Sequence, residues 1–180
     1  MSETNLYTVT VPPMMKALKA LDGLLDKVDV HAKSKQLEWH PAGLQEDALL
    51  QSRLISDQFP FIRQIQVACD NAKNGLARVA GIEAPKFEDN EKTIAELKAR
   101  IEKTVAFLKT MKPADLVGKE GGKVTLPYWG GKSMTAGDYV QNYLIPNFYF
   151  HVATAYSILR KNGLAVGKGD YMGALPLQDL

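Results

Sequence analysis

Four polar side chains recur at helical spacing in the segment "YLIPNFYFHVAT", residues 143–154. Tyr143, Asn147 and His151 are four residues apart, and Thr154 follows three residues later. A helix repeats every 3.6 residues, so these positions share one face of a helix that is otherwise mostly apolar. A polar line inside a protein needs hydrogen-bond partners, water or a ligand. We define these four residues as the polar seam, a candidate ligand pocket; a core hydrogen-bond network is the alternative.

Histidine also binds transition metals, so His151 is a candidate ligand for Zn or Ni. A catalytic metal site of this kind uses three protein ligands, and asparagine at position 147 would be a poor ligand for zinc. Other possible donors are His40 and the side-chain oxygens of Asp57, Gln58 and Gln64. His31 is instead expected at the surface, at the C-terminal end of the first helix. None of them has the spacing of a known metal motif. The metal interpretation therefore depends on His151 and on partners that the sequence leaves open.

Two further groups of reactive side chains have simpler interpretations. Cys69 lies in the apolar helical run "FIRQIQVACDNA", which favours a buried structural thiol over a nucleophile. Lys168, Asp170 and Tyr171 in "GKGDYMG" could form a charged cluster with Arg160. A tail that packs on the bundle and makes surface ion pairs is the favoured interpretation of this segment.

Composition narrows the class of protein. The net charge is +2 with acids and bases interspersed, which argues against a nucleic-acid surface. The N-terminal segment "MSETNLYTVTVPP" lacks the basic and apolar regions of a signal peptide. No apolar run approaches the roughly 20 residues of a membrane span. We therefore expect a cytoplasmic protein that binds neither nucleic acid nor membrane.

The elements that would position these side chains are four amphipathic helices. Apolar residues recur at three- and four-residue steps in four segments, residues 11–33, 57–79, 92–111 and 135–162. Asp57 is expected to cap the second helix and Gly81 to end it. Glu96 and Arg100 have the spacing of an ion pair on a solvent face of the third. Pro146 predicts a kink or break in the fourth.

The segment between the third and fourth helices has a different amino-acid composition. It is rich in glycine and contains the β-prone run "KVTLPYW", which predicts a short β-hairpin-like excursion. The fold class is therefore all-α, a four-helix bundle with this excursion between helices three and four. We expect residues 1–180 to form one domain.

Several segments resemble a known family. The runs "NFYFHVATAYSILRKNG", "VGKGDYMG", "FPFIRQIQVACDNAK" and "FEDNEKTIAELKARI" are similar to the bacterial family called domain of unknown function nineteen ninety-three. That family resembles the DinB/YfiT-like metalloenzymes, which implies a DinB-like four-helix bundle and often a homodimer. The superfamily binds a divalent metal through one histidine of the second helix and a His-x-x-x-His pair on the fourth.

The resemblance places His151 at the second histidine of that pair, because Gly163 follows it by the expected twelve residues. Asn147 stands where the first would be, and residues 57–79 contain no histidine. Two of three ligands are therefore missing. This favours a dimeric binding protein with a polar, small-molecule pocket around His151. The alternatives are a divalent-metal-dependent hydrolase or thiol transferase with a degenerate site, and a purely structural role for the polar seam.

Overall fold

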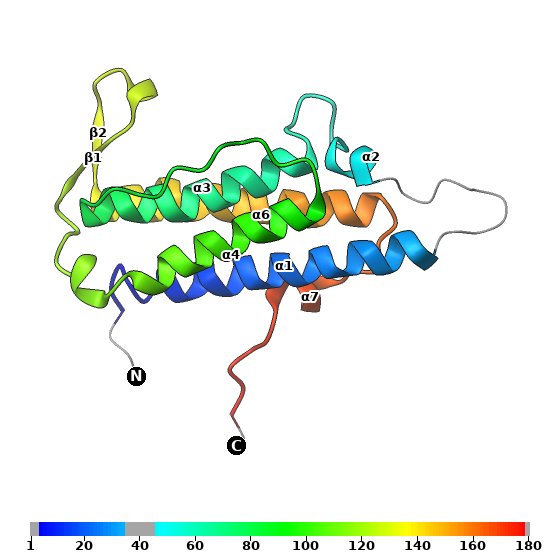
Figure 1. The fold of residues 1–180 in the computed structure, drawn as a ribbon. Helices are drawn as coiled ribbons and strands as arrows, with labels where there is room; N and C mark the ends of the chain where they lie inside the picture. Colours follow the sequence, from blue (N-terminus) through cyan, green and yellow to red (C-terminus); the bar gives the residue numbers. More distant parts are fainter. Residues whose placement is uncertain (1–3, 35–45, 179–180) are drawn as a thin grey trace.

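Four long helices run side by side as a bundle (Figure 1). The computed structural model describes residues 4–34 and 46–178. The long helices are α1 (Val11–Ser34), α3 (Phe61–Ala80), α4 (Ile94–Thr110) and α6 (Ile145–Lys161). Helix α3 packs against both α6 and α4, and α1 packs against α4. The predicted all-α four-helix bundle is confirmed.

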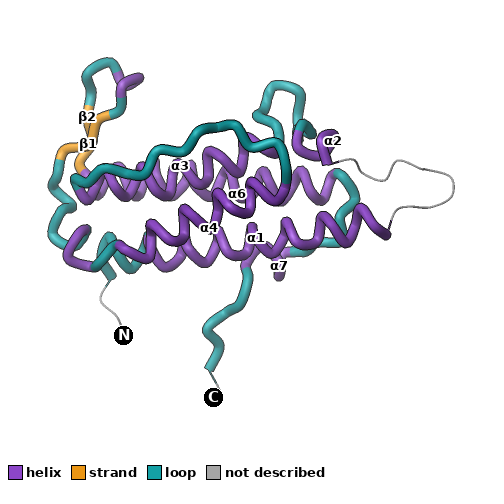
Figure 2. Tube along the Cα trace, in the orientation of Figure 1, coloured by secondary structure: helices purple, strands orange, loops and turns teal. Residues whose placement is uncertain are grey.

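Short elements join or flank these helices (Figure 2). Before α3 lies α2 (Glu46–Leu50), and after α4 comes the 3₁₀ turn η1 (Pro113–Asp115). The excursion then contains β1 (Lys123–Thr125), the 3₁₀ turn η2 (Pro127–Trp129) and β2 (Ser133–Thr135). The two strands pair antiparallel, with Val124 opposite Met134. The hairpin-like excursion is therefore confirmed, and it stands at one end of the bundle.

The start of α3 differs from the expectation. Asp57 does not cap the helix, which begins at Phe61 with Pro60 in the cap position. Phe59 precedes a proline, which disfavours the helical conformation and keeps the helix from extending further back. The preceding loop is fixed instead by tertiary contacts: Ser52 O accepts from Phe61 N at 2.8 Å, and Ser52 Oγ accepts from Asn162 Nδ2 at 2.9 Å. Gly81 ends α3 in the left-handed conformation, as predicted.

The fourth helix is continuous but contains a π turn. Thr135 caps it by accepting from the Asp138 N–H at 3.1 Å. The chain then passes through α5 (Ala136–Tyr139), the π-helical turn η3 (Val140–Leu144) and α6. Pro146 has no N–H to donate, and its ring crowds the preceding helical turn. The helix widens here, so that the N–H of Ile145 donates to the carbonyl of Val140. The predicted irregularity at Pro146 thus takes the form of a π turn.

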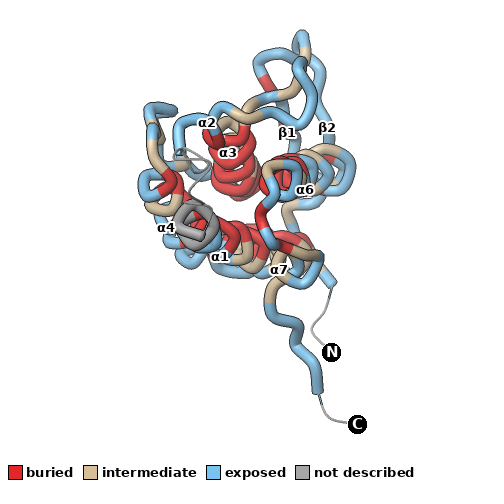
Figure 3. The backbone as a smooth tube through the Cα atoms, turned by 90° about the vertical axis from the view of Figure 1, so that its right-hand side faces the viewer, coloured by how far each residue is buried: buried red, intermediate tan, exposed pale blue. Residues whose placement is uncertain are grey.

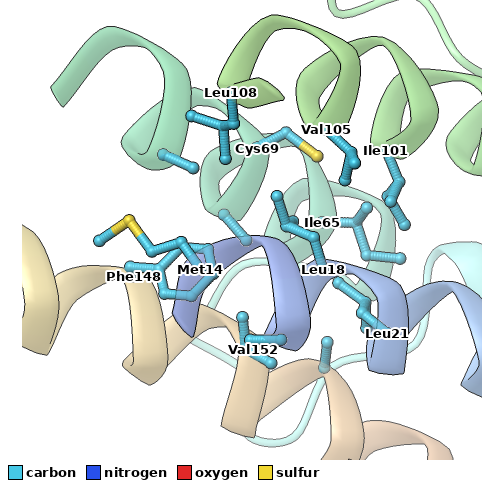
Figure 4. Close-up of a cluster of buried hydrophobic side chains, with 14 of the residues drawn as sticks. Met14, Leu18, Leu21, Ile65, Cys69, Ile101, Val105, Leu108, Phe148 and Val152 are labelled. Atoms are coloured by element: carbon cyan, nitrogen blue, oxygen red, sulfur yellow. The ribbon is translucent and has the colours of Figure 1, made fainter. Parts of the chain in front are cut away.

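The core lies between the four long helices (Figures 3 and 4). Leu18 of α1, Ile65 of α3, Leu108 of α4 and Phe148 of α6 are fully buried and meet there. Cys69 is also buried, and loss of water raises the pKa of its thiol to about 12. The thiol is therefore neutral at physiological pH, as expected of a structural cysteine. None of the described helices is both long enough and apolar enough to cross a membrane.

The predicted solvent-exposed pair of Glu96 and Arg100 is wrong. Arg100 is only 2% exposed and contacts Asp70 of α3 at 2.8 Å. It also contacts Asp89 at 2.9 Å and Glu91 at 2.8 Å, in the segment that runs back along the bundle between α3 and α4. Glu96 instead completes the capping box of α4. Periodicity could not show that this segment covers the side of α4 carrying Arg100.

Candidate functional site

His151 is held at the α3–α6 contact by an amide of α3. Its Nδ1 lies 2.6 Å from Oε1 of Gln64, and the histidine is only 7% exposed. The Nε2 group of Gln64 donates to the backbone carbonyl of Phe59 at 2.9 Å, which orients the amide and leaves its oxygen facing the imidazole. Since that oxygen can only accept, Nδ1 carries the proton and donates it. The neutral ring is thereby fixed in one tautomer.

The other ring nitrogen of His151 is open. Nε2 has no hydrogen-bond partner among the residues that the structure describes, and it is not fully enclosed. Burial, aided by the positive charge of Arg63, lowers the pKa of His151 to about 4. At neutral pH, Nε2 therefore presents a lone pair, which can accept a hydrogen bond or bind a metal.

Two phenylalanine rings flank His151. Phe59 stacks on the imidazole with the ring centroids 6.5 Å apart and the planes 19° apart. Phe150 meets it edge-on at 5.3 Å. Both phenylalanines are 51% exposed, whereas Phe61 and Phe148 are fully buried. The imidazole therefore lies beneath an exposed aromatic surface formed by the loop before α3 and by α6.

The other members of the polar seam have separate partners. Asn147 Nδ2 donates to Asn71 Oδ1 of α3 at 3.2 Å. Thr154 Oγ1 donates to the carbonyl of Phe150, one turn earlier in its own helix, at 2.7 Å. Tyr143 shares a hydroxyl–hydroxyl hydrogen bond of 2.5 Å with the exposed Tyr128. Thr154 thus bonds within its own helix and Asn147 bonds across to α3, while His151 is the buried histidine whose Nε2 has no partner among the described residues.

Comparison with known proteins places this bundle in a family. The model described as "Domain of unknown function (DUF1993)" matches residues 6–172. The chain belongs to the DUF1993 family. The crystal structure of a DinB family member protein from Shewanella denitrificans is 42% identical to it, with a TM-score of 0.89 over 97% of this chain and 96% of that one. No curated protein matches the chain. The resemblance seen in the sequence is confirmed.

The metal site of the wider superfamily does not fit the described part of this DUF1993 chain. Within residues 4–34 and 46–178, no three His, Cys, Asp or Glu side chains are placed to hold a metal ion together. The side chain that faces His151 from α3 is the amide of Gln64, and the nearby charge of Arg63 opposes a cation. Asp57 is exposed on the loop before α3, and Gln58 Oε1 is buried with no hydrogen-bond partner among the described residues. The side chain of His31 and all of His40 lie outside the described residues.

The tail of this DUF1993 chain packs on the bundle, as the favoured interpretation had it. Helix α7 (Lys168–Met172) lies against α1, and Asp170 pairs with Lys27 at 2.7 Å. Arg160 donates to the carbonyl of Val166 at 2.7 Å, and Tyr171 meets Tyr156 edge-on. The alternative cluster of Lys168, Asp170 and Tyr171 around Arg160 is therefore not formed.

Sequence reasoning missed two features near the polar seam. Gln64 appeared only as a possible oxygen donor to a metal, whereas it sets the tautomer of His151. The rings of Tyr139 and Tyr143 stack with centroids 5.5 Å apart and form one wall of a cleft beside α3. Their four-residue spacing was a signal for this stacking, but the adjoining hairpin residues could not be placed from the sequence.

Proposed function

We propose that this DUF1993 protein is a cytoplasmic binding protein that takes up a small molecule at His151 without a metal. The ligand would donate an N–H or O–H to Nε2 and place an apolar part against Phe59 and Phe150. The observation that carries the proposal is the fixed, neutral imidazole whose Nε2 has no partner among the described residues. A buried acceptor beside exposed aromatic rings suits a ligand that is partly polar and partly apolar.

The pKa of His151 favours binding over proton transfer. A general base works best when its pKa lies near the operating pH. With a pKa of about 4, His151 is a weak base at neutral pH and an effective hydrogen-bond acceptor. The site therefore supports recognition of a donor group better than acid–base catalysis.

The second candidate function is a divalent-metal-dependent hydrolase or thiol transferase with a degenerate site. One observation favours it: histidines that bind metals usually donate their other N–H to a neighbouring acceptor, as Nδ1 does to Gln64. The remaining ligands would have to come from outside the described residues, with His40 as the first candidate.

Elemental analysis separates the two functions. The wild type, His151→Ala and His40→Ala are purified without added metal, and long-range ¹H–¹⁵N spectra record the tautomer of His151. We expect no stoichiometric Zn or Ni in any of the three proteins and a protonated Nδ1 in the wild type. A metal that is present in the wild type and lost from both variants would contradict the metal-free binding function and support the metal-dependent enzyme.

The exposed aromatic surface also supports a homodimer as part of the proposal. Ile55, Phe59 and Phe150 are large apolar side chains that are more than half exposed. Exposed apolar patches commonly mark interaction sites. Light scattering should give twice the chain mass of 19.9 kDa. A protein that stays monomeric at all accessible concentrations would remove the dimer from the proposal and leave the binding site untouched.

A further inference from the structure

A second cleft lies about two helical turns along α3 from Gln64, where α3 meets the hairpin and the π turn. Its volume is about 180 Å³. Its lining includes Asp70, Asn71, Arg78, Tyr128, Tyr139 and Tyr143. Helix α3 supplies the polar side, and the segments around η2 and η3 supply the aromatic side. The cleft belongs to neither the His151 site nor the tail.

Arg78 is exposed and brings a positive charge to the mouth of this cleft. Its Nη1 donates to the Tyr139 hydroxyl at 3.1 Å and to the Asn74 carbonyl at 3.4 Å. Within the described part of the chain, no carboxylate lies within ion-pair distance of Arg78. Asp70 also lines the cleft, but Arg100 at 2.8 Å and Lys73 at 3.2 Å already neutralise it. The cleft therefore favours an anion.

Aromatic rings form the opposite wall. Tyr139 and Tyr143 stack with their planes 19° apart, and Trp129 meets both rings edge-on. Tyr128 is 69% exposed at the rim and is tied to Tyr143 through their hydroxyl groups. Burial raises the pKa of Tyr139 and Tyr143, so both phenols are neutral and do not repel an anion. Tyr139 is only 2% exposed, so a flat ring would find its stacking partners on Tyr143 and Tyr128.

We propose that this cleft binds a small monocyclic carboxylate. The carboxylate would pair with the guanidinium of Arg78, whose fork geometry suits two parallel hydrogen bonds, and the ring would pack on the tyrosines. A cavity of about 150 Å³ holds a benzene molecule, so this cleft has room for one ring bearing a carboxylate. Asn71 Nδ2 is buried and has no acceptor in the part of the chain that the structure describes, and a ligand oxygen deep in the cleft would supply one.

The test is calorimetric titration of the full chain with sodium benzoate. For a ligand of this size we expect saturable binding with a Kd of about 10 mM or tighter. Benzamide has the same shape without the charge and should bind at least about tenfold more weakly. Arg78→Gln should weaken benzoate binding at least about tenfold. Lys132→Gln removes an exposed charge from the hairpin and should leave binding unchanged.

Three results would overturn the proposal: no saturation with benzoate, equal binding of benzamide, or unchanged binding in Arg78→Gln. Thermal unfolding checks that each variant folds. If Arg78→Gln does not fold, Tyr128→Ala replaces it, because Tyr128 is exposed at the rim and its loss should also weaken benzoate binding. His151→Ala should bind benzoate like the wild type, which separates this cleft from the His151 site.

Discussion

Helix α3 makes a buried polar contact on each of two sides, and the two contacts differ in whether the buried group has an atom that a ligand could reach. On the α4 side, three carboxylates contact the Nη groups of Arg100, and the centre of the Phe87 ring lies 5.2 Å from its guanidinium carbon. The Nε group of Arg100 is enclosed and has no hydrogen-bond partner among the described residues. On the α6 side, His151 has one amide partner and an open Nε2. A polar group that is wholly enclosed serves the fold, whereas one with an atom that is not fully enclosed is free to meet a ligand.

The Arg100 contact joins the two helices to the segment between them. Asp70 comes from α3, and Asp89 and Glu91 come from the connecting segment, so one guanidinium holds three separate stretches of chain. The Phe87 ring also makes a cation–π contact with Lys73, whose Nζ lies 4.7 Å from the ring centre. The cluster explains why this long connection lies along the bundle.

Removal of Arg100 should have the largest effect on stability. Arg100→Ala would leave Asp70 and Glu91 without their main partner, and loss of one member of a buried ion pair typically costs about 3–5 kcal/mol. Urea unfolding followed by circular dichroism measures this change. Lys109→Ala, an exposed position on the same helix, is the matched control and should change the free energy of unfolding very little. Equal changes in the free energy of unfolding for the two variants would show that the Arg100 ion pairs do not stabilise the fold.

The next effect is a pH dependence that comes from His151. Its pKa is about 4 in the folded protein and 6.5 in its ordinary state. Between these values the unfolded chain binds the extra proton, so the free energy of unfolding should fall as the pH drops through this window, by up to about 3 kcal/mol. Subtraction of the curve for His151→Gln cancels the carboxylates common to both proteins. A flat difference curve between pH 6.5 and 4 would contradict the depressed pKa.

A smaller effect is expected where α3 approaches the π turn. A Cβ on Gly75 would lie 2.3 Å from Cδ1 of Leu144, which is fully buried and has little room to move. Gly75→Ala should therefore cost about 1–3 kcal/mol, as overpacking usually does. Gly23→Ala is the control, since a Cβ there meets nothing within 4 Å. That change should be neutral or stabilising by up to about 1 kcal/mol in a helix. A neutral Gly75→Ala would mean that Leu144 can move aside.

The helices were predictable because their signals are local. Apolar periodicity identified all four long helices, and α1 begins at Val11 as expected. Gly81 was correctly expected to end α3, and Pro146 to disturb the fourth helix. The prediction that Asp57 caps α3 failed because the start of this helix is not set by a local capping signal. A capping residue was available there, but Pro60 and contacts from distant segments decided where α3 begins.

The candidate sites depend on contacts between distant residues. His151 stood out in the sequence, but its partner Gln64 is 87 positions away and its flanking Phe59 lies in another segment. The same holds for Arg100, which has the pattern of a surface residue and is buried by carboxylates from two other segments. A single helix pattern gives the face on which a residue lies, and does not give what covers that face.

The all-α bundle, the hairpin-like excursion and the position of His151 on the polar face of the fourth helix could be predicted from the amino-acid sequence. These follow from periodicity and from turn residues, which act within a few residues of each other. Three features became visible only in the folded chain: Gln64 fixes the His151 tautomer, Arg100 is buried, and Arg78 lies across a cleft from tyrosines. Those outcomes depend on how each helix is rotated against its neighbours, and that rotation is set by packing of the whole core.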